Sequence, residues 1–178
     1  MQFKYYTHDQ KDDVIALYEQ TFGASEGEAE GQVIGELVNN MLTITAETEL
    51  IPLVAFDNDT LVGAIIFSKM YFTPTINAYI LSPVAVSPSY QGKGVGQGLI
   101  NFGLEQLKQG TVELVFTYGD PSYYSKMGFQ QIPEAQIPAP VPMSHPEGWL
   151  CQSLTEGEIP KVDQRPSCIE ALSDPGYW

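Results

Sequence analysis

The chain has 178 residues, of which 43% are hydrophobic, and it carries 22 acidic against 8 basic residues, for a formal net charge of −14. This length and apolar content indicate one folded domain with a sizeable core and exclude a disordered tail. The acidic balance disfavours nucleic acid and anionic membranes as partners and favours a cationic acceptor such as an amine, although solubility alone also explains it.

The sequence offers no targeting or metal-binding signal. No apolar run approaches the ~20 residues that a membrane span needs, and residues 1–5 lack the basic and apolar regions of a secretion signal. Cys151 and Cys168 can in principle pair, but without an export signal they are more often reduced thiols. His8 and His145 stand alone, without metal-ligand spacing. We therefore expect a cytoplasmic protein without a metal.

The first half of the chain alternates between segments of strand and helix periodicity. The expected strands are 2–7, 50–56, 61–71 and 78–86, and the expected helices are 12–22 and 28–41. Asp57-Asn58-Asp59 predicts a hairpin turn between two of these strands. The residues expected to form the apolar stripes of the two helices are Val14, Leu17, Tyr18 and Phe22, and Val33, Ile34, Leu37, Val38 and Met41.

The second half begins with an amphipathic pattern at 96–109, which predicts a helix that ends at Gly110. Its expected inward residues are Leu99, Ile100, Gly103, Leu104 and Leu107. A buried strand follows at 112–118. Asp120 and Pro121 predict the N-cap and first residue of a short helix that reaches Met127. Five prolines within 133–146 then indicate an irregular excursion, and 149–154 is expected to be the last strand.

Residues 84–100 pass from an apolar run through four glycines, at every second position, into the helical pattern. These glycines are Gly92, Gly94, Gly96 and Gly98. Glycine allows positive φ and lets a ligand approach the backbone, and the first N–H groups of a helix have no intrahelical partner. A phosphorylated ligand is therefore expected here. Because the chain has few cations, backbone N–H groups would hold it, with help from Lys93.

Two familiar glycine-loop patterns do not fit this segment. The Walker pattern fails because Gly94 follows Lys93 and Ser87 stands where the first glycine is required. The dinucleotide pattern Gly-x-Gly-x-x-Gly/Ala fails because Gln97 or Leu99 stands at its last position. Neither a nucleotide triphosphatase nor a nicotinamide enzyme is expected.

The pattern that fits is Gln/Arg-x-x-Gly-x-Gly/Ala, present as Gln91-Gly92-Lys93-Gly94-Val95-Gly96. It is preceded by Val84-Ala85-Val86-Ser87-Pro88 and followed by Tyr124-Ser125-Lys126-Met127-Gly128-Phe129. Together these elements resemble the GNAT superfamily of acetyl-CoA-dependent N-acetyltransferases, and most of all its YhbS-like branch. The resemblance covers roughly residues 50–130.

The resemblance implies an α/β (α+β mixed sheet) class: a GNAT-like acyl-CoA N-acyltransferase fold with a central twisted mixed sheet flanked by helices. Its fourth and fifth strands splay apart. Residues 1–178 are expected to form a single such domain, with a core of about 1–132 and a Pro-rich C-terminal extension at 133–178.

The resemblance also implies acetyl-CoA, or coenzyme A, as the co-substrate. Its pantetheine arm would pair with the main chain of the strand at Val84 and Val86, and its pyrophosphate would lie on the glycine loop. The expected cofactor-binding residues are Val84, Ala85, Val86, Gln91, Gly92, Lys93, Gly94, Val95, Gly96 and Gln97. A backbone N–H of this strand would polarise the thioester carbonyl.

Tyr124 is the expected proton donor to the departing thiolate, because it stands four residues before Gly128, where the family places its acid. A phenol has a reference pKa of ~10, close to that of a thiol. Packing alone is the other explanation for Tyr124, and the adjacent Tyr123 leaves open which ring faces the cofactor.

The general base is not evident, since residues 77–82 offer no carboxylate where many family members place one. The base is then either a water chain or a carboxylate among Glu26, Glu28 and Glu30. Glu28 and Glu30 are the candidate acceptor-binding residues, although such a charged run is often only a solvated face.

The expected function is direct transfer of an acetyl group to a primary amine, of a small molecule or a protein, in a ternary complex. A homodimer is left open. The alternative is a catalytically weak acetyl-CoA-binding sensor or interaction module with the same fold. Transfer of a longer acyl group, or to a hydroxyl, also stays open.

Overall fold

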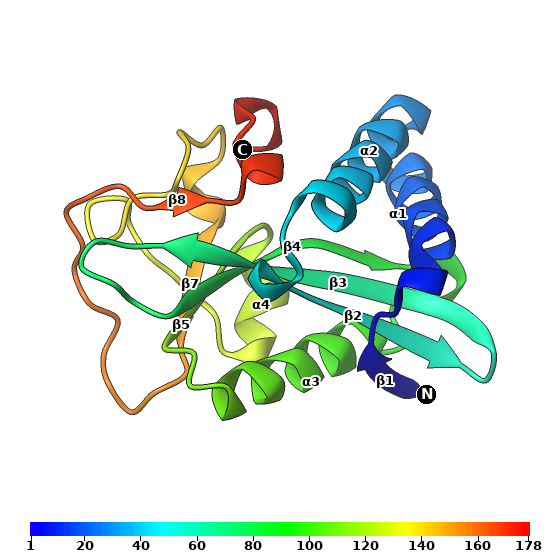
Figure 1. The fold of residues 1–178 in the computed structure, drawn as a ribbon, viewed down its shortest axis with the longest axis horizontal. Helices are drawn as coiled ribbons and strands as arrows, with labels where there is room; N and C mark the ends of the chain where they lie inside the picture. Colours follow the sequence, from blue (N-terminus) through cyan, green and yellow to red (C-terminus); the bar gives the residue numbers. More distant parts are fainter. The chain divides into compact units, whose positions relative to one another are not determined.

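The computed structural model describes residues 1–178 and has a mixed α/β architecture, as expected (Figure 1). The strands are β1 (Gln2–Tyr5), β2 (Leu50–Asp57), β3 (Thr60–Tyr71), β4 (Ala78–Val86), β5 (Leu114–Tyr118), β6 (Gln130–Gln131), β7 (Trp149–Ser153) and β8 (Ser167–Cys168). The helices are α1 (Lys11–Glu26), α2 (Glu28–Ile44), α3 (Val95–Gln109) and α4 (Pro121–Tyr124). The strand order in the sheet is β1-β2-β3-β4-β5-β7-β6, and β8 pairs with β3. No helix is both long enough and apolar enough to cross a membrane.

The chain forms two compact units, each built from two stretches. The first unit comprises Met1–Ile66 and Pro83–Gly103, and the second comprises Phe67–Ser82 and Leu104–Trp178. The ends of β4 and the glycine loop therefore belong to the first unit, whereas β5 and α4 belong to the second.

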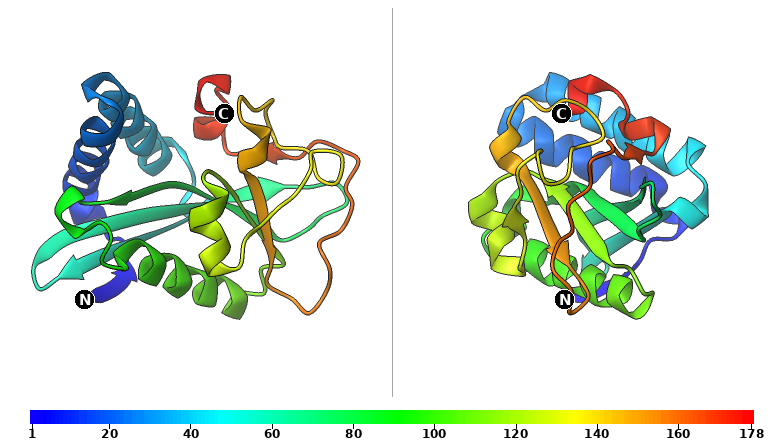
Figure 2. Two further views of the ribbon diagram at one scale, coloured as in Figure 1. Left: turned by 180° about the vertical axis from the view of Figure 1, so that it is seen from behind. Right: turned by 90° about the vertical axis from the view of Figure 1, so that its left-hand side faces the viewer.

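In the first unit, β1 pairs antiparallel with β2, and α1 and α2 lie side by side as a hairpin (Figure 2). A Cβ on Gly31 would lie only 2.5 Å from the carbonyl oxygen of Glu19, so the small glycine lets the two helices approach closely. Gly27, with φ of 102°, separates them. Helix α1 runs past the expected end at residue 22 to Glu26.

The core face of this hairpin matches the expected stripes, except that Phe22 is only half-buried and Val33 is exposed. The buried helix residues are Val14, Leu17, Tyr18, Ile34, Leu37, Val38 and Met41. Val33 is instead 43% exposed, so its assignment to the stripe was wrong. The buried positions of α2 follow the i, i+3, i+4, i+7 spacing from Ile34, and Val33 falls outside that arc.

In the second unit, β4 runs parallel to β5, and β7 pairs antiparallel with both β5 and β6. The core contains stacked rings, with centroids 5.7 Å apart for Phe72 and Phe116 and 5.0 Å apart for Phe116 and Trp149. The indole N–H of Trp149 donates to the carbonyl of Ile137 at 2.9 Å, which ties the irregular Pro-rich segment to β7. The strand at 149–154 is not the last, because the two-residue β8 follows it.

Helix α3 ends at Gln109, directly before Gly110, as the sequence predicted. Thr111, and not Gly110, takes the left-handed conformation, with φ of 63°. The N–H of Val112 donates to the carbonyl of Leu107 at 3.1 Å and that of Thr111 to Lys108 at 3.2 Å. This is the hydrogen-bond pattern of a Schellman motif, with threonine at the position that usually carries glycine.

Candidate functional site

The loop between β4 and α3 has the open glycines that the sequence predicted. Gly92 and Gly94 have φ of 73° and 80°, and a Cβ at either position would meet no atom within 4 Å. The backbone conformation therefore requires glycine here, and the space around both Cα atoms is free for a ligand.

The last of the four glycines has another role. Gly98 lies within α3, and a Cβ there would come within 2.6 Å of the ring of Phe3 on β1. The Phe3 ring also lies 6.2 Å from that of Phe102. Gly98 thus makes room for β1 against α3 and is explained by packing.

Helix α3 begins at Val95, directly after the loop. The first intrahelical bond of this turn runs from the N–H of Gly98 to the carbonyl of Gly94, at 2.9 Å. The preceding N–H groups, of Val95, Gly96 and Gln97, therefore have no intrahelical acceptor. Together with the partial positive charge of the helix end, they can bind an anion such as a pyrophosphate.

Lys93 is the cation of this loop. Its Nζ lies 5.0 Å from the centroid of the Tyr90 ring, and the Tyr90 hydroxyl donates to Oδ2 of Asp57 at 3.0 Å. That hydrogen bond is the main cause that raises the pKa of Tyr90. The exposed Lys93 ammonium therefore lies over the Tyr90 ring, and the hydrogen bond to Asp57 at the end of β2 fixes the position of that ring.

The carbonyl of Val86, at the end of β4, accepts hydrogen bonds from two side chains. Nε2 of Gln91 donates at 3.0 Å and Oγ1 of Thr21, on α1, at 3.4 Å. The Gln91 amide thus closes the loop back onto β4. Thr21 was not singled out from the sequence, because its partner is 65 residues away.

Tyr18 was predicted only as part of an apolar stripe, yet its hydroxyl has a specific position. It is fully buried, and its hydroxyl oxygen lies 2.9 Å from the carbonyl oxygen of Pro83 and 3.0 Å from that of Ala64. Helix α1 therefore contacts the β4 carbonyls on both sides of Val84 and Ala85. A tyrosine in an aliphatic stripe was the available signal, because a buried phenol needs a partner.

The main-chain N–H and C=O groups of successive β4 residues point to opposite sides of the strand here. The N–H of Ser87 donates to the carbonyl of Val62 on β3 at 2.9 Å. Because successive residues of a strand direct their main-chain groups to opposite sides, the N–H groups of Val84 and Val86 are turned away from β3. These are the two residues that the sequence assigned to the pantetheine arm.

In the second unit, the pairing of β4 with β5 ends before β4 does. The paired residues run from Ala78 opposite Leu114 to Leu81 opposite Thr117, while β4 continues to Val86. At the last pair, Oγ1 of Thr117 donates to the carbonyl of Leu81 at 3.0 Å. The early end of this pairing agrees with the predicted splay of the fourth and fifth strands.

Helix α4 begins as predicted, and it carries Tyr124. The Asp120 carboxylate accepts from the N–H and the hydroxyl of Ser122, both at 2.8 Å, and these bonds lower the pKa of Asp120. The Tyr124 ring packs edge-on against those of Tyr123, at 5.1 Å, and Phe129, at 5.8 Å.

Burial raises the pKa of Tyr124 to about 12, against a smaller opposing effect of the Thr117 hydroxyl. The phenol is therefore neutral at physiological pH and able to donate a proton. Its proton is about 3 kcal/mol harder to release than that of a free phenol, at about 1.4 kcal/mol per pKa unit. The close match to a thiol that the reference pKa suggested is thus lost. Burial also raises the pKa of Tyr123.

The remaining candidates have simpler surroundings. Glu28 and Glu30 lie in the first turn of α2, where the helix dipole stabilises carboxylates. Neither side chain forms an ion pair or hydrogen bond, and Glu28 is exposed.

Burial raises the pKa of the Cys151 thiol, which disfavours a nucleophilic role. No group of three or more His, Cys, Asp or Glu side chains is placed to hold a metal ion.

Comparison with known proteins finds a matching family and similar curated proteins. Residues 11–129 match the acetyltransferase (GNAT) family. The chain is 32% identical over 161 residues to the uncharacterized N-acetyltransferase YjhQ of Escherichia coli K12, covering 86% of this chain and 85% of that protein. It is 30% identical over 120 residues to the uncharacterized N-acetyltransferase YhbS of the same strain, covering 66% of each.

Two solved structures have the same fold. The GNAT family N-acetyltransferase YhbS from Escherichia coli, in complex with CoA, has a TM-score of 0.81 and 21% identity, over 97% of this chain and 92% of that one. A GNAT family acetyltransferase from Brucella melitensis, in complex with acetyl-CoA, has a TM-score of 0.74 and 23% identity, over 96% of each chain.

Proposed function

The chain belongs to the GNAT family of acetyltransferases, and on this premise we propose that it transfers the acetyl group of acetyl-CoA directly to a primary amine in a ternary complex. One observation carries the proposal. The loop between β4 and α3 combines two open, positive-φ glycines with the unpaired N–H groups of a helix start. Related enzymes of this fold have been crystallised with CoA or acetyl-CoA.

We assign the pyrophosphate of the cofactor to residues 91–97, where Lys93 supplies the positive charge. The pantetheine arm would lie along residues 84–86, as an added strand pairs with a sheet edge. The direction of the Val84 and Val86 N–H groups, away from β3, supports this assignment. One of them would also polarise the thioester carbonyl as the amine attacks.

Tyr124 is the proposed acid that protonates the thiolate of coenzyme A as the carbon–sulfur bond breaks. Its raised pKa keeps the proton in place until negative charge develops on the sulfur. The energy required is higher than for a free phenol, so proton transfer is expected to follow thioester cleavage closely and not to precede it.

The acceptor is proposed to be a cationic amine that must lose a proton before attack. The net charge of −14 favours its approach, and Glu28 and Glu30 are the proposed contacts. A water chain or one of these carboxylates would remove the proton. We further propose that residues 1–178 act as one transferase domain in the cytoplasm, with a homodimer as one assembly to be tested.

A catalytically weak acetyl-CoA sensor is the second candidate. The strand residues 78–82 contain no carboxylate to act as a general base, which favours this alternative. Both candidates predict binding of coenzyme A to the same loop, and they differ only in acceptor-dependent chemistry.

Two measurements test and separate these functions. Calorimetric titration of the folded full chain with coenzyme A should show saturable binding, and no heat of binding would overturn both candidates. Thiol release from acetyl-CoA should then increase when polyamines, amino acids, aminoglycosides or lysine peptides are added. Binding without release for any amine, hydroxyl acceptor or longer acyl donor would establish the sensor.

A further inference from the structure

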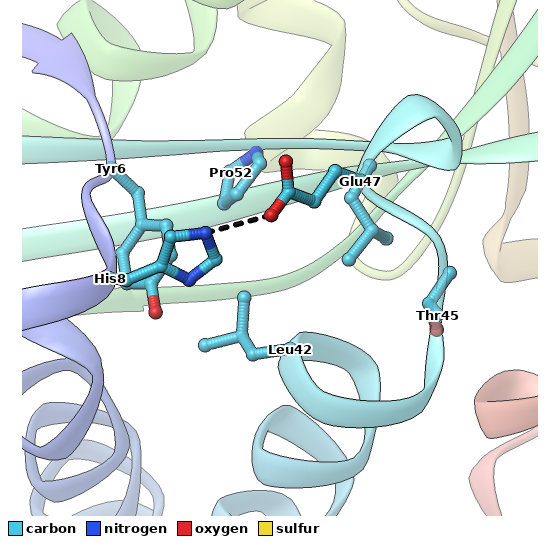
Figure 3. Close-up of a pocket in the computed structure, with 7 residues that line it drawn as sticks. Tyr6, His8, Leu42, Thr45, Glu47 and Pro52 are labelled. Atoms are coloured by element: carbon cyan, nitrogen blue, oxygen red, sulfur yellow. Dashed lines mark hydrogen bonds and ion pairs between the residues drawn. The ribbon is translucent and has the colours of Figure 1, made fainter.

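The first unit contains a pocket that shares no residue with the glycine loop or its supporting side chains. It has a volume of about 150 Å³ and lies among the segment after β1, the end of α2 and the start of β2 (Figure 3). Its apolar lining consists of Leu42, Leu50 and Pro52. The proposed function gives it no role.

Tyr6 and Thr45 also line the pocket. The hydroxyl of Tyr6 is buried, has no hydrogen-bond partner and leaves no surface for a bound molecule to contact. The pocket is therefore lined by the Tyr6 ring and not by its hydroxyl.

A carboxylate lies at the open side of the same pocket. Oε1 of Glu47 lies 2.8 Å from Nε2 of His8, and both side chains are exposed, so the second carboxylate oxygen is accessible (Figure 3). The His8 ring also packs edge-on against Tyr6, with centroids 5.9 Å apart. The pocket thus presents a carboxylate and two aromatic rings above an apolar floor.

The charges around the pocket favour a cation. Burial raises the pKa of Tyr6, and the nearby carboxylates of Asp9 and Asp12 raise it further. Lys11 is the neighbouring cation, and its ammonium donates to Thr43 Oγ1 at 2.7 Å. The carboxylates near the pocket outnumber the Lys11 ammonium, just as acidic residues outnumber basic residues over the whole chain.

We propose that this pocket binds a small primary ammonium compound. Its N–H groups would donate to the exposed Glu47 carboxylate, and its alkyl body would lie on Leu42, Leu50 and Pro52. A cavity of about 150 Å³ is large enough for a benzene molecule, so an alkyl chain of about four to six carbons fits. Such a site would let amine concentration act on the protein whether or not the amine is acetylated.

The test uses the full chain and n-butylammonium chloride, without acetyl-CoA. At 19.6 kDa the protein suits amide chemical-shift mapping by NMR. Saturable shifts are expected at residues 6–8, 42–47 and 50–51. Neutral n-butanol should bind at least about tenfold more weakly, because it lacks the charge-assisted hydrogen bond.

One substitution and one matched control complete the test. Glu47→Gln should weaken butylammonium binding about tenfold. Glu49→Gln removes the same charge from the same short 3₁₀ turn, Glu47–Glu49, but does not line the pocket, and it should leave the affinity unchanged.

Three outcomes would overturn the proposal. They are the absence of saturable shifts at these residues, equal binding of butanol and butylammonium, and equal losses in Glu47→Gln and Glu49→Gln. Because the readout is binding alone, a failure here leaves the transferase proposal intact, and a failure of acetyl transfer leaves this proposal intact.

Discussion

The hydroxyl of Tyr18 on α1 lies 2.9 Å from the carbonyl oxygen of Pro83 on β4. The two residues are 65 positions apart in the chain. Thr21, one turn later on α1, contacts the carbonyl of Val86. The helix therefore holds β4 at both ends of the segment to which we assign the pantetheine arm.

Replacing Tyr18 should weaken cofactor binding without removing a group that touches the cofactor. Tyr18→Phe removes the hydroxyl donor and leaves two buried carbonyls without it, which should cost about 1–2 kcal/mol of unfolding free energy. The dissociation constant of coenzyme A should rise about threefold to tenfold, while kcat changes less. Titration calorimetry and urea unfolding measure both. Tyr71→Phe, at a 39% exposed side chain, is the control, and an equal change in that variant would contradict the positioning role.

The two adjacent tyrosines should differ in catalysis. Tyr124→Phe removes the proposed acid and should lower kcat by about 10²–10⁴, with coenzyme A affinity nearly unchanged. Tyr123→Phe makes the same chemical change in the neighbouring ring and should retain most activity. Steady-state kinetics with a saturating amine compares them. A full loss in Tyr123→Phe together with an active Tyr124→Phe would exchange their roles.

The raised pKa of Tyr124 also predicts how stability depends on alkaline pH. The phenol has a pKa near 10 when unfolded and about 12 when folded, so between these values the unfolded chain binds fewer protons. The contribution of the Tyr124 phenol to the free energy of unfolding is therefore complete below pH 10. It falls by at most about 3 kcal/mol as the pH rises from 10 to 12. Tyr124→Phe should therefore show a shallower alkaline decline in urea unfolding than the wild type. Parallel declines would show that the phenol is not buried in solution.

Gly119 should determine the position of the Tyr124 ring. A Cβ at Gly119 would lie 2.7 Å from Cε2 of Tyr124, so Gly119→Ala must displace that ring. A displacement of a catalytic group by a fraction of an ångström should lower kcat by about tenfold or more, with little effect on coenzyme A binding. In Gly110→Ala, the nearest atom to the new Cβ is 3.5 Å away, an ordinary contact. Equal activity of these two variants would count against the role of Tyr124.

The end of α3 offers a stabilising substitution. Thr111 has φ of 63°, a conformation that costs an L-residue about 1–2 kcal/mol and glycine almost nothing. Thr111→Gly should therefore raise the unfolding free energy by about 1 kcal/mol, and Thr111→Asn by less. Thermal or urea unfolding measures the gain. A loss of stability in both variants would mean that Thr111 makes a compensating contact.

Much of the fold follows from local patterns in the sequence. The strand at 78–86, the glycine loop and the Asp120–Pro121 helix start were each predicted from neighbouring residues, and the structure contains all three. Such features can be predicted because backbone conformation, helix capping and side-chain periodicity depend on residues only a few positions apart. The family likewise follows from short motifs of neighbouring residues.

The tertiary structure decided what depends on distant partners. Tyr18 and Tyr6 both look like ordinary aromatic residues in the sequence, yet one hydroxyl contacts a β4 carbonyl and the other is buried without a partner. Val33 fits a helical stripe but lies outside the buried arc, and Thr111, not the glycine before it, takes the left-handed conformation. In each case the outcome depends on which element packs against the residue, and hydrophobic periodicity contains no information on that choice.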